Sequence, residues 1–115
     1  MTEPSIFTRI LNGDIPGEIL AETDRVFAIR DINPQAPVHL LVIPKTEQYR
    51  NVVELAAGDP ELLGEIVSLS NDLAATHADG EFRLVFNTGA TAGQTVVHVH
   101  AHVLAGGLSE ASVGA

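Results

Sequence analysis

The sequence predicts one α+β domain in which a long helix covers one face of a mainly antiparallel β-sheet. Short apolar segments typical of strands occur both before and after a single long amphipathic segment. The chain has 115 residues, enough for one compact core and too few for two ordinary domains. No internal repeat or low-complexity tract divides it. We therefore expect residues 1–115 to form a single domain.

The N-terminal third predicts a short helix followed by a β-hairpin. The helix is indicated by apolar residues that share one side of a helical turn, namely Ile6, Phe7, Ile10 and Leu11. Asn12-Gly13-Asp14 is a polar, glycine-bearing segment typical of a helix end. Segments 19–21 and 26–29 predict two short strands that join across Thr23-Asp24.

The rest of the chain predicts three more strands and the long helix. Segment 39–43 is apolar and ends at Pro44, which indicates a buried strand. Asp59-Pro60 provides a cap and a first-turn proline for a helix that runs to about His77. Its apolar positions recur at helical spacing: Leu62, Ile66, Leu69 and Leu73. Further strands are predicted at 82–86 and 97–104, on either side of a glycine-containing loop at 87–94.

The composition favours a soluble globular protein and excludes several classes of function. No apolar run approaches the roughly 18 residues that span a bilayer, and no signal-peptide pattern is visible, so we expect a cytoplasmic protein without a membrane partner. Six Lys and Arg against fifteen Asp and Glu give a net charge of -9, which argues against a nucleic-acid partner. The chain has no cysteine, so histidine is the main candidate nucleophile and metal ligand.

Three of the five histidines, His98, His100 and His102, occupy alternate positions in a segment of strand-forming residues. On a strand, three imidazoles would line one face about 6.6 Å apart, while the residues between them pack the other face. Nucleophilic catalysis fits this row, because imidazole is mostly neutral at pH 7 and a phosphorus-bound imidazole is a good leaving group. A second imidazole can donate to phosphate oxygens.

Two other interpretations of the histidines remain open. They could be core residues, which is our interpretation of the isolated His77, although three in a row would each need a polar partner. They could also bind a metal ion. The outer pair would lie roughly 13 Å apart on a straight strand, and no carboxylate lies within the segment, although His39 could contribute from elsewhere.

These residues resemble a known family, the histidine triad (HIT) superfamily, whose signature alternates three histidines with hydrophobic residues. The similarity extends over roughly residues 5–106 and is closest to the Hint branch of histidine triad nucleotide-binding proteins. It depends on three segments, which are Asp31 to Lys45, Asn87 to Val96 and His98-Val99-His100-Ala101-His102-Val103-Leu104. A single HIT domain with a core of about 5–106 and a mobile tail at 107–115 follows.

The resemblance implies a HIT-like fold with a five-stranded antiparallel sheet, joined to that of a second subunit in a ten-stranded sheet of a homodimer. It implies one purine nucleotide site per subunit. His100 would be the nucleophile, His98 would orient it, His102 would contact phosphate oxygens, and His39 would support the cluster by hydrogen bonding. We expect no cofactor and no metal ion at this site.

The resemblance also implies a set of nucleotide-binding residues. Asp31 would accept hydrogen bonds from the ribose hydroxyls, and Thr95 would help to protonate the leaving group. The base would lie between the apolar side chains of Phe7, Ile10 and Ile32, and the phosphate would bind a loop containing Asn87, Gly93, Gln94 and Thr95. Without the resemblance, Asp31 could be a turn former, Asn87 a cap and the glycines ordinary loop residues.

The chain departs from its relatives at three points. It lacks the cysteines that hold a structural zinc in some bacterial relatives, so no structural metal is expected. Several Hint-branch proteins end in a tail with aromatic residues that reaches toward the active site of the partner subunit. The tail of this chain, 108–115, has no aromatic residue, so the preference for a leaving group stays open. Thr95 stands where a serine is often found, which keeps the hydroxyl.

Three functions are compatible with these features. The first is a purine nucleoside phosphoramidase, a hydrolase of P–N or related nucleotidyl bonds that releases a nucleoside monophosphate such as AMP through a nucleotidyl-histidine intermediate. The second is a dinucleoside polyphosphate hydrolase, and the third is a nucleotide-binding regulatory protein with incidental catalysis. The segment 31–39 favours the first over the second.

Overall fold

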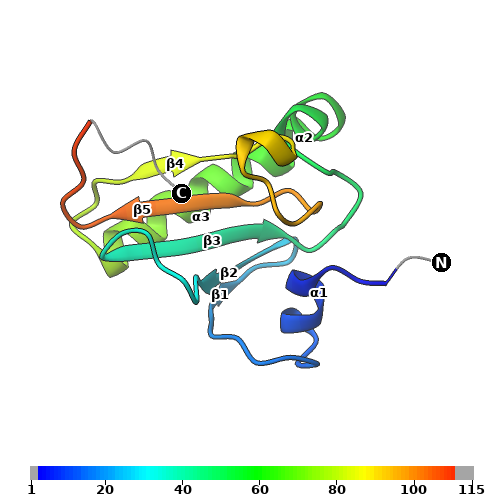
Figure 1. Cartoon of the computed structure of the whole chain (residues 1–115), viewed down its shortest axis with the longest axis horizontal. Coiled ribbons are helices and arrows are strands. Elements are labelled where there is room, and N and C mark those ends of the chain that lie inside the picture. Colours follow the sequence, from blue (N-terminus) through cyan, green and yellow to red (C-terminus); the bar gives the residue numbers. More distant parts are fainter. Residues whose placement is uncertain (1–2, 111–115) are drawn as a thin grey trace.

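The computed structural model describes residues 3–110 and has the α+β architecture that the sequence predicts (Figure 1). Helices and strands follow in the order α1 (Ile6–Leu11), β1 (Ile19–Glu22), β2 (Val26–Arg30), β3 (Val38–Pro44), α2 (Val52–Gly58), α3 (Pro60–His77), β4 (Arg83–Val85), the 3-10 turn η1 (Ala90–Ala92) and β5 (Ala101–Ala105). The predicted N-terminal helix, the hairpin and the long helix are confirmed at nearly the expected residues.

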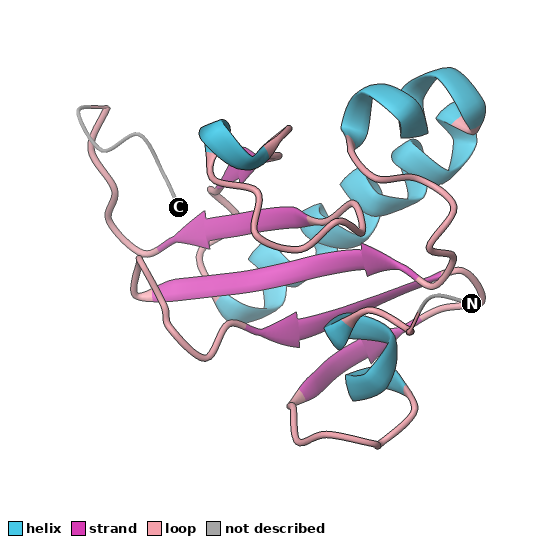
Figure 2. Cartoon of the chain, turned by 45° about the vertical axis from the view of Figure 1, so that its right-hand side comes forward, coloured by secondary structure: helices cyan, strands magenta, loops and turns pink. Residues whose placement is uncertain are grey.

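The five strands form one antiparallel sheet in the order β1-β2-β3-β5-β4. This confirms the five-stranded sheet that the family resemblance implies. The helix α3 crosses behind the sheet, while α1 lies on its other side (Figures 1 and 2). The two faces of the sheet are therefore covered by different helices.

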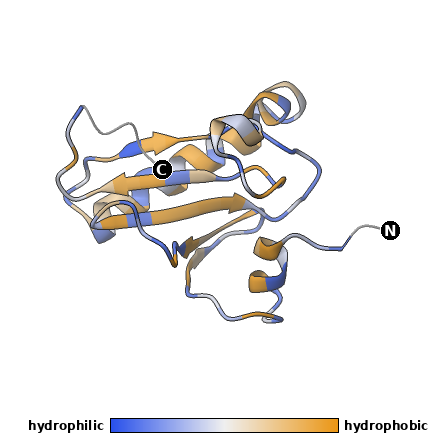
Figure 3. Cartoon of the chain, in the orientation of Figure 1, coloured by the Kyte–Doolittle hydropathy of each residue, from blue (hydrophilic) through white to orange (hydrophobic). Residues whose placement is uncertain are grey.

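Two hydrophobic layers result from the period-two alternation of the strands. On the α3 side, Ile66 and neighbouring helix residues pack against Leu40, Val42 and Val103. On the α1 side, Phe7 packs against a second cluster made of Phe27, Ile29, Leu41 and Ile43. The strands are accordingly hydrophobic along most of their length (Figure 3). The central strands β2, β3 and β5 are therefore buried along most of their length and support the side chains on the α1 side.

The long helix α3 begins as its sequence predicts. Asp59 accepts a hydrogen bond from the backbone N–H of Leu62 at 3.0 Å, and Pro60 occupies the first turn. Within it, Ser70 is fully buried, and its hydroxyl donates to the carbonyl of Ile66 at 2.8 Å. No helix among residues 3–110 is long and apolar enough to cross a membrane.

The structure differs from the predictions in three elements. The helix α2 was not predicted, because its seven residues are too few for an apolar period to repeat, and only Leu55 among them is buried. The strand β4 is shorter than the predicted 82–86. The last strand begins at Ala101 and not at Val97, because its pairing with β3 starts at the Val42–Ala101 pair.

The C-terminal tail is partly described. The Arg83 side chain donates to the carbonyl oxygen of Ser109 at 2.7 Å, which holds the first part of the tail beside β4. Most of the segment predicted to be mobile, residues 111–115, lies outside the described residues.

Candidate active site

Four histidines gather on the α1 side of the sheet, one near the start of β3 and three in the segment that leads into β5. Of the three alternating histidines, only His102 belongs to a strand; His98 and His100 precede β5, so the prediction of three imidazoles on one strand is wrong in this respect. His39 on β3 lies close to His102 because the two strands pair side by side. Leu41 pairs with His102, and His39, two residues earlier on β3, pairs with Leu104. The ring centroids of His100 and His102 are 5.1 Å apart, and those of His39 and His102 are 5.2 Å apart.

His98 is held at both ring nitrogens. Its Nε2 lies 2.7 Å from the carbonyl oxygen of Pro44, which can only accept, so Nε2 carries the proton. Its Nδ1 therefore accepts the hydroxyl proton of Ser5, whose Oγ lies at 2.6 Å. The ring is fully buried, and this burial lowers its pKa below the ordinary value. With both nitrogens used inside the protein, His98 cannot contact a substrate through its ring.

His100 has one engaged and one open ring nitrogen. Its Nδ1 lies 2.9 Å from the carbonyl oxygen of His98 and must donate to it, which leaves a lone pair on Nε2. Within residues 3–110 no buried side-chain nitrogen or oxygen lacks a hydrogen-bond partner, so Nε2, which has none, must reach solvent. Burial of the ring lowers the His100 pKa, and the lone pair is therefore available at neutral pH.

His102 receives its tautomer from His39. The backbone N–H of Gln35 donates to Nδ1 of His39 at 3.0 Å, so the proton of His39 is on Nε2. That Nε2 lies 3.0 Å from Nδ1 of His102, which accepts, and His102 then presents an Nε2–H donor. Burial, followed by the proximity of His100 and His39, lowers the pKa of His102 to about 4. A neutral donor thus lies beside the His100 lone pair.

A carboxylate from outside the histidine segment, Asp31, joins this cluster. Oδ2 of Asp31 lies 3.3 Å from Nε2 of His39, and the possible ligand atoms of Asp31, His39 and His102 lie within 4.8 Å of one another. A neutral His39 that bound a metal through Nε2 would need its proton on Nδ1, where it would face the N–H of Gln35. The hydrogen-bond directions therefore favour an imidazole relay over a metal site, and the absence of a metal stays a prediction.

The chain matches a known protein family over most of its length. The family model for the HIT domain matches residues 12–107 of this chain. The chain belongs to the HIT domain family. An uncharacterized HIT-like protein of Synechocystis sp. is 44% identical over 110 residues, covering 92% of this chain and 93% of the relative. Purine nucleoside phosphoramidase of Escherichia coli K12 is 37% identical over 108 residues, covering 92% and 90%.

Solved structures agree with this assignment. A HIT family hydrolase from Clostridium thermocellum superposes with a TM-score of 0.85 at 40% identity, covering 96% of each chain. A histidine triad protein from Clostridium difficile superposes with a TM-score of 0.83 at 36% identity, covering 95% of this chain and 96% of the other. The five-stranded sheet is therefore that of a HIT fold.

The loop expected to bind phosphate is largely satisfied by its own hydrogen bonds. Both the Gly93 and Gln94 N–H groups donate to carbonyls within the loop. The Gln94 side chain donates to the carbonyls of Arg50 and Val96 and accepts from the N–H of Gly89, so it anchors the loop. Gly93 has φ +96°, which disfavours any other residue, although a Cβ would meet Asn87 only at an ordinary 3.6 Å. The positive φ by itself therefore favours glycine at this position.

The other predicted nucleotide contacts differ in accessibility. Phe7 is only 5% exposed, and its ring meets that of His100 edge-on at a centroid distance of 4.8 Å, so it supports the histidines and offers little surface to a base. Ile32 is 94% exposed, Ile10 is half-buried and Thr95 is exposed. Asp31 forms the turn that its residue type allows, because Oδ1 accepts from the N–H of Asn33 at 2.8 Å.

Sequence reasoning missed the groups that orient the imidazoles: Ser5, Gln35 and Pro44. Two of them act through backbone atoms, which carry no sequence signal. Ser5 does have a local signal, since serine before an apolar helical segment is typical of an N-cap, and its Oγ accepts from the N–H of Thr8 at 3.3 Å. Nothing in the sequence links it to His98.

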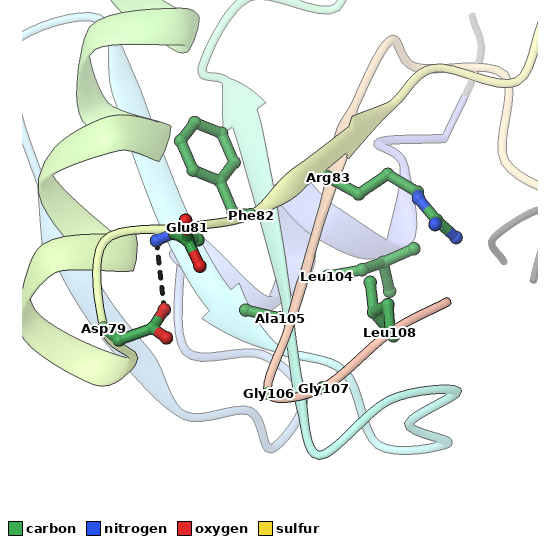
Figure 4. A pocket seen from close by; sticks show the side chains of 9 residues that line it. All are labelled: Asp79, Glu81, Phe82, Arg83, Leu104, Ala105, Gly106, Gly107 and Leu108. Carbon is green, nitrogen blue, oxygen red and sulfur yellow. Dashed lines mark hydrogen bonds between the residues drawn. The ribbon is translucent and has the colours of Figure 1, made fainter. Parts of the chain in front are cut away.

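A cavity of about 310 Å³ lies apart from the histidines, at the other end of β5 (Figure 4). It is lined by residues 79–83, including Arg83, and by residues 104–108, where the tail leaves the sheet. The histidine cluster is the stronger candidate for the active site, because several titratable groups with lowered pKa values converge there.

Proposed function

We propose that this HIT domain protein is a nucleotidyl hydrolase, specifically a purine nucleoside phosphoramidase that releases a nucleoside monophosphate such as AMP. The observation that carries the proposal is the tautomer of His100, whose Nδ1–H is held by the His98 carbonyl while the Nε2 lone pair reaches solvent. The phosphoramidase activity in the name of the Escherichia coli relative supports the substrate class.

The reaction has two displacement steps. His100 Nε2 attacks the α-phosphorus, the bond from phosphorus to the leaving amine breaks, and the amine takes up the hydroxyl proton of the exposed Thr95. Water then attacks the nucleotidyl-imidazole, returns a proton to Thr95 and gives the nucleoside monophosphate and free His100. The positive charge on the His100 ring in the intermediate is stabilised by its bond to the His98 carbonyl and by the nearby Asp31 carboxylate, both of which raise the His100 pKa.

His102 and Asp31 complete the proposed substrate contacts. The Nε2–H of His102 donates to a phosphate oxygen, and because this imidazole is neutral it does not compete with His100 for a proton. Asp31 keeps acceptor capacity for the ribose hydroxyls, since a carboxylate has about four lone-pair sites, one of which accepts from the N–H of Asn33, while Oδ2 lies 3.3 Å from Nε2 of His39. Ile32, as an exposed apolar residue, contacts the base.

The proposal includes a homodimer. The strand β4 is an edge of the five-stranded sheet, and its outer side pairs with no other strand of the described chain. An unpaired edge can extend a sheet by pairing with a second copy, which would give the ten-stranded sheet implied by the family resemblance.

The test is covalent trapping with adenosine 5′-phosphoramidate. The wild type should form an acid-labile adduct of AMP on His100, detected by mass spectrometry, and a chiral phosphorus substrate should be hydrolysed with net retention. His100→Ala should lower turnover by several orders of magnitude while AMP still binds. His77→Ala removes a histidine outside the cluster and should retain the adduct. Inversion at phosphorus, or near-normal turnover of His100→Ala, would mean that water attacks directly.

Two rival functions give different results in the same assay. Faster turnover of a dinucleoside polyphosphate than of the phosphoramidate would assign the protein to dinucleoside polyphosphate hydrolysis. Tight binding of AMP without turnover of either substrate would indicate a regulatory nucleotide-binding protein.

A further inference from the structure

The N-terminal helix reaches the histidine cluster through one hydroxyl. Ser5 begins α1, and its Oγ lies 2.6 Å from Nδ1 of His98, a residue 93 positions later. The ring of His98 is also held at Nε2 by the Pro44 carbonyl, so its two nitrogens are fixed from opposite sides. Removal of either partner would free the ring to move within the core.

The direction of the Ser5 bond follows from its neighbours. Because Nε2 of His98 must carry the proton toward Pro44, Nδ1 has a lone pair and Ser5 must donate. The Ser5 oxygen meanwhile accepts from the N–H of Thr8 at 3.3 Å, while the alternative acceptor, Oγ1 of Thr8, is 3.5 Å away. One hydroxyl thus caps the helix and satisfies a buried imidazole lone pair at the same time.

The position of Ser5 is itself anchored from β3. Glu47, in the loop after β3, accepts from the Ser5 N–H at 3.0 Å and from the Thr8 hydroxyl at 2.8 Å. Phe7 of the same helix meets the His98 ring at a centroid distance of 5.8 Å, edge-on. The start of α1 is therefore held in place by Glu47 and packs against the His98 ring.

We infer that Ser5 is a positioning residue for the His100 nucleophile and that it acts through His98. Fixing the His98 ring fixes the backbone of the same residue, whose carbonyl accepts from Nδ1–H of His100 at 2.9 Å. That bond holds the proton of His100 on Nδ1 and leaves the lone pair on Nε2. The inference depends on the proposed nucleophilic role of His100 and extends it to a residue that makes no contact with substrate.

The test distinguishes the role of the Ser5 hydroxyl as a donor to His98 from its role as the N-cap of α1. Ser5→Gly removes the hydroxyl at a capping cost of only a few tenths of a kcal/mol, because glycine is an acceptable N-cap. Ser5→Thr keeps the hydroxyl and is the rescue variant. Thr8→Val is the matched control, since it removes the Thr8 hydroxyl that binds Glu47 in the same helix and leaves the Ser5–His98 bond in place.

Single-turnover formation of the AMP adduct from adenosine 5′-phosphoramidate is the kinetic readout. Ser5→Gly should slow this step about fivefold to tenfold, as expected for one lost neutral hydrogen bond, while the Kd for AMP changes less than about twofold. Ser5→Thr and Thr8→Val should retain the wild-type rate. An unchanged rate in Ser5→Gly, or an equal loss in Thr8→Val, would overturn the inference.

A histidine NMR measurement decides the same question without catalysis. Long-range proton–nitrogen correlation in the wild type should show His98 protonated on Nε2 and His100 on Nδ1. In Ser5→Gly, His100 should populate both tautomers; a His100 ring that keeps one tautomer there would overturn the inference. If the wild type forms no adduct but the tautomers change as stated, the proposed function fails while the positioning role of Ser5 stands.

The pH profile of adduct formation gives a second distinction. Burial is the main cause that lowers the pKa of His100, and the nearby His98 ring lowers it further. The hydrogen bond to the His98 carbonyl and the nearby Asp31 carboxylate act in the opposite direction and raise it. In Ser5→Gly, a weaker hydrogen bond from His100 Nδ1–H to the His98 carbonyl should therefore move the acidic limb of the pH profile to lower pH. Ser5→Thr should return the limb to its wild-type position. A lower rate without this displacement would indicate a loss of stability only and would contradict a positioning role.

Discussion

Acidification should destabilise this protein through its buried imidazoles, and His102 allows the size of the effect to be calculated. Its pKa is about 4 in the folded chain, against 6.5 for an ordinary histidine. Between these values the unfolded state binds more protons than the folded state, so the free energy of unfolding falls as pH is lowered through this window. Above pH 6.5 both states are neutral and His102 contributes no pH dependence.

Between pH 7 and pH 5 this pKa shift lowers the free energy of unfolding by at most about 2 kcal/mol. Solvent reaches the Nε2 side of the ring, so screening reduces the expected loss to about 1 kcal/mol. His39, His98 and His100 act in the same direction, because burial lowers each of their pKa values. The fold should therefore lose more stability than His102 alone accounts for.

Urea denaturation at several pH values between 5 and 7 measures the effect. His102→Gln removes the titrating group, and the difference in unfolding free energy between pH 7 and pH 5 should shrink by about 1 kcal/mol relative to wild type. His77→Gln removes a histidine at the end of α3, away from the cluster, and is the matched control. If His102→Gln and His77→Gln show the same pH dependence, the assignment of His102 as a buried neutral imidazole is wrong.

Two further outcomes are expected. Activity should survive exhaustive chelation, because the proton of His39 occupies the nitrogen that a metal would need; loss of activity on chelation with recovery on adding zinc would reassign Asp31, His39 and His102 as ligands. Sedimentation at micromolar concentration should give roughly twice the mass of one chain, because β4 leaves a sheet edge open, and a monomer that still turns over substrate would contradict the shared sheet.

Local patterns in the sequence were sufficient for most of the fold. The helix α3 repeats its apolar residues at helical spacing and starts at a capping aspartate followed by proline, and both signals act within a few residues of the chain. The alternation from residue 98 to residue 102 correctly places Val99, Ala101 and Val103 in the α3-side core. Such patterns depend only on neighbouring residues, so they can be interpreted without the tertiary structure.

The ends of elements were less predictable. The strand β5 starts where its partner β3 begins to pair with it, and this is a property of two segments far apart in sequence. The segment before it is held by contacts outside the sheet ladder, such as the bond from the Val99 N–H to the Tyr49 carbonyl at 3.1 Å. The helix α2 has one buried residue and so carries too weak a pattern to identify.

By itself the sequence determined the fold class, the family resemblance and the row of histidines that carries the chemistry. Only the tertiary structure decided what each imidazole does. A ring nitrogen donates or accepts according to the group opposite it, and those groups are the Ser5 hydroxyl, the Pro44 carbonyl and the Gln35 N–H. They reach the histidines through folding, which is why His98 is held at both nitrogens while His100 keeps an open lone pair.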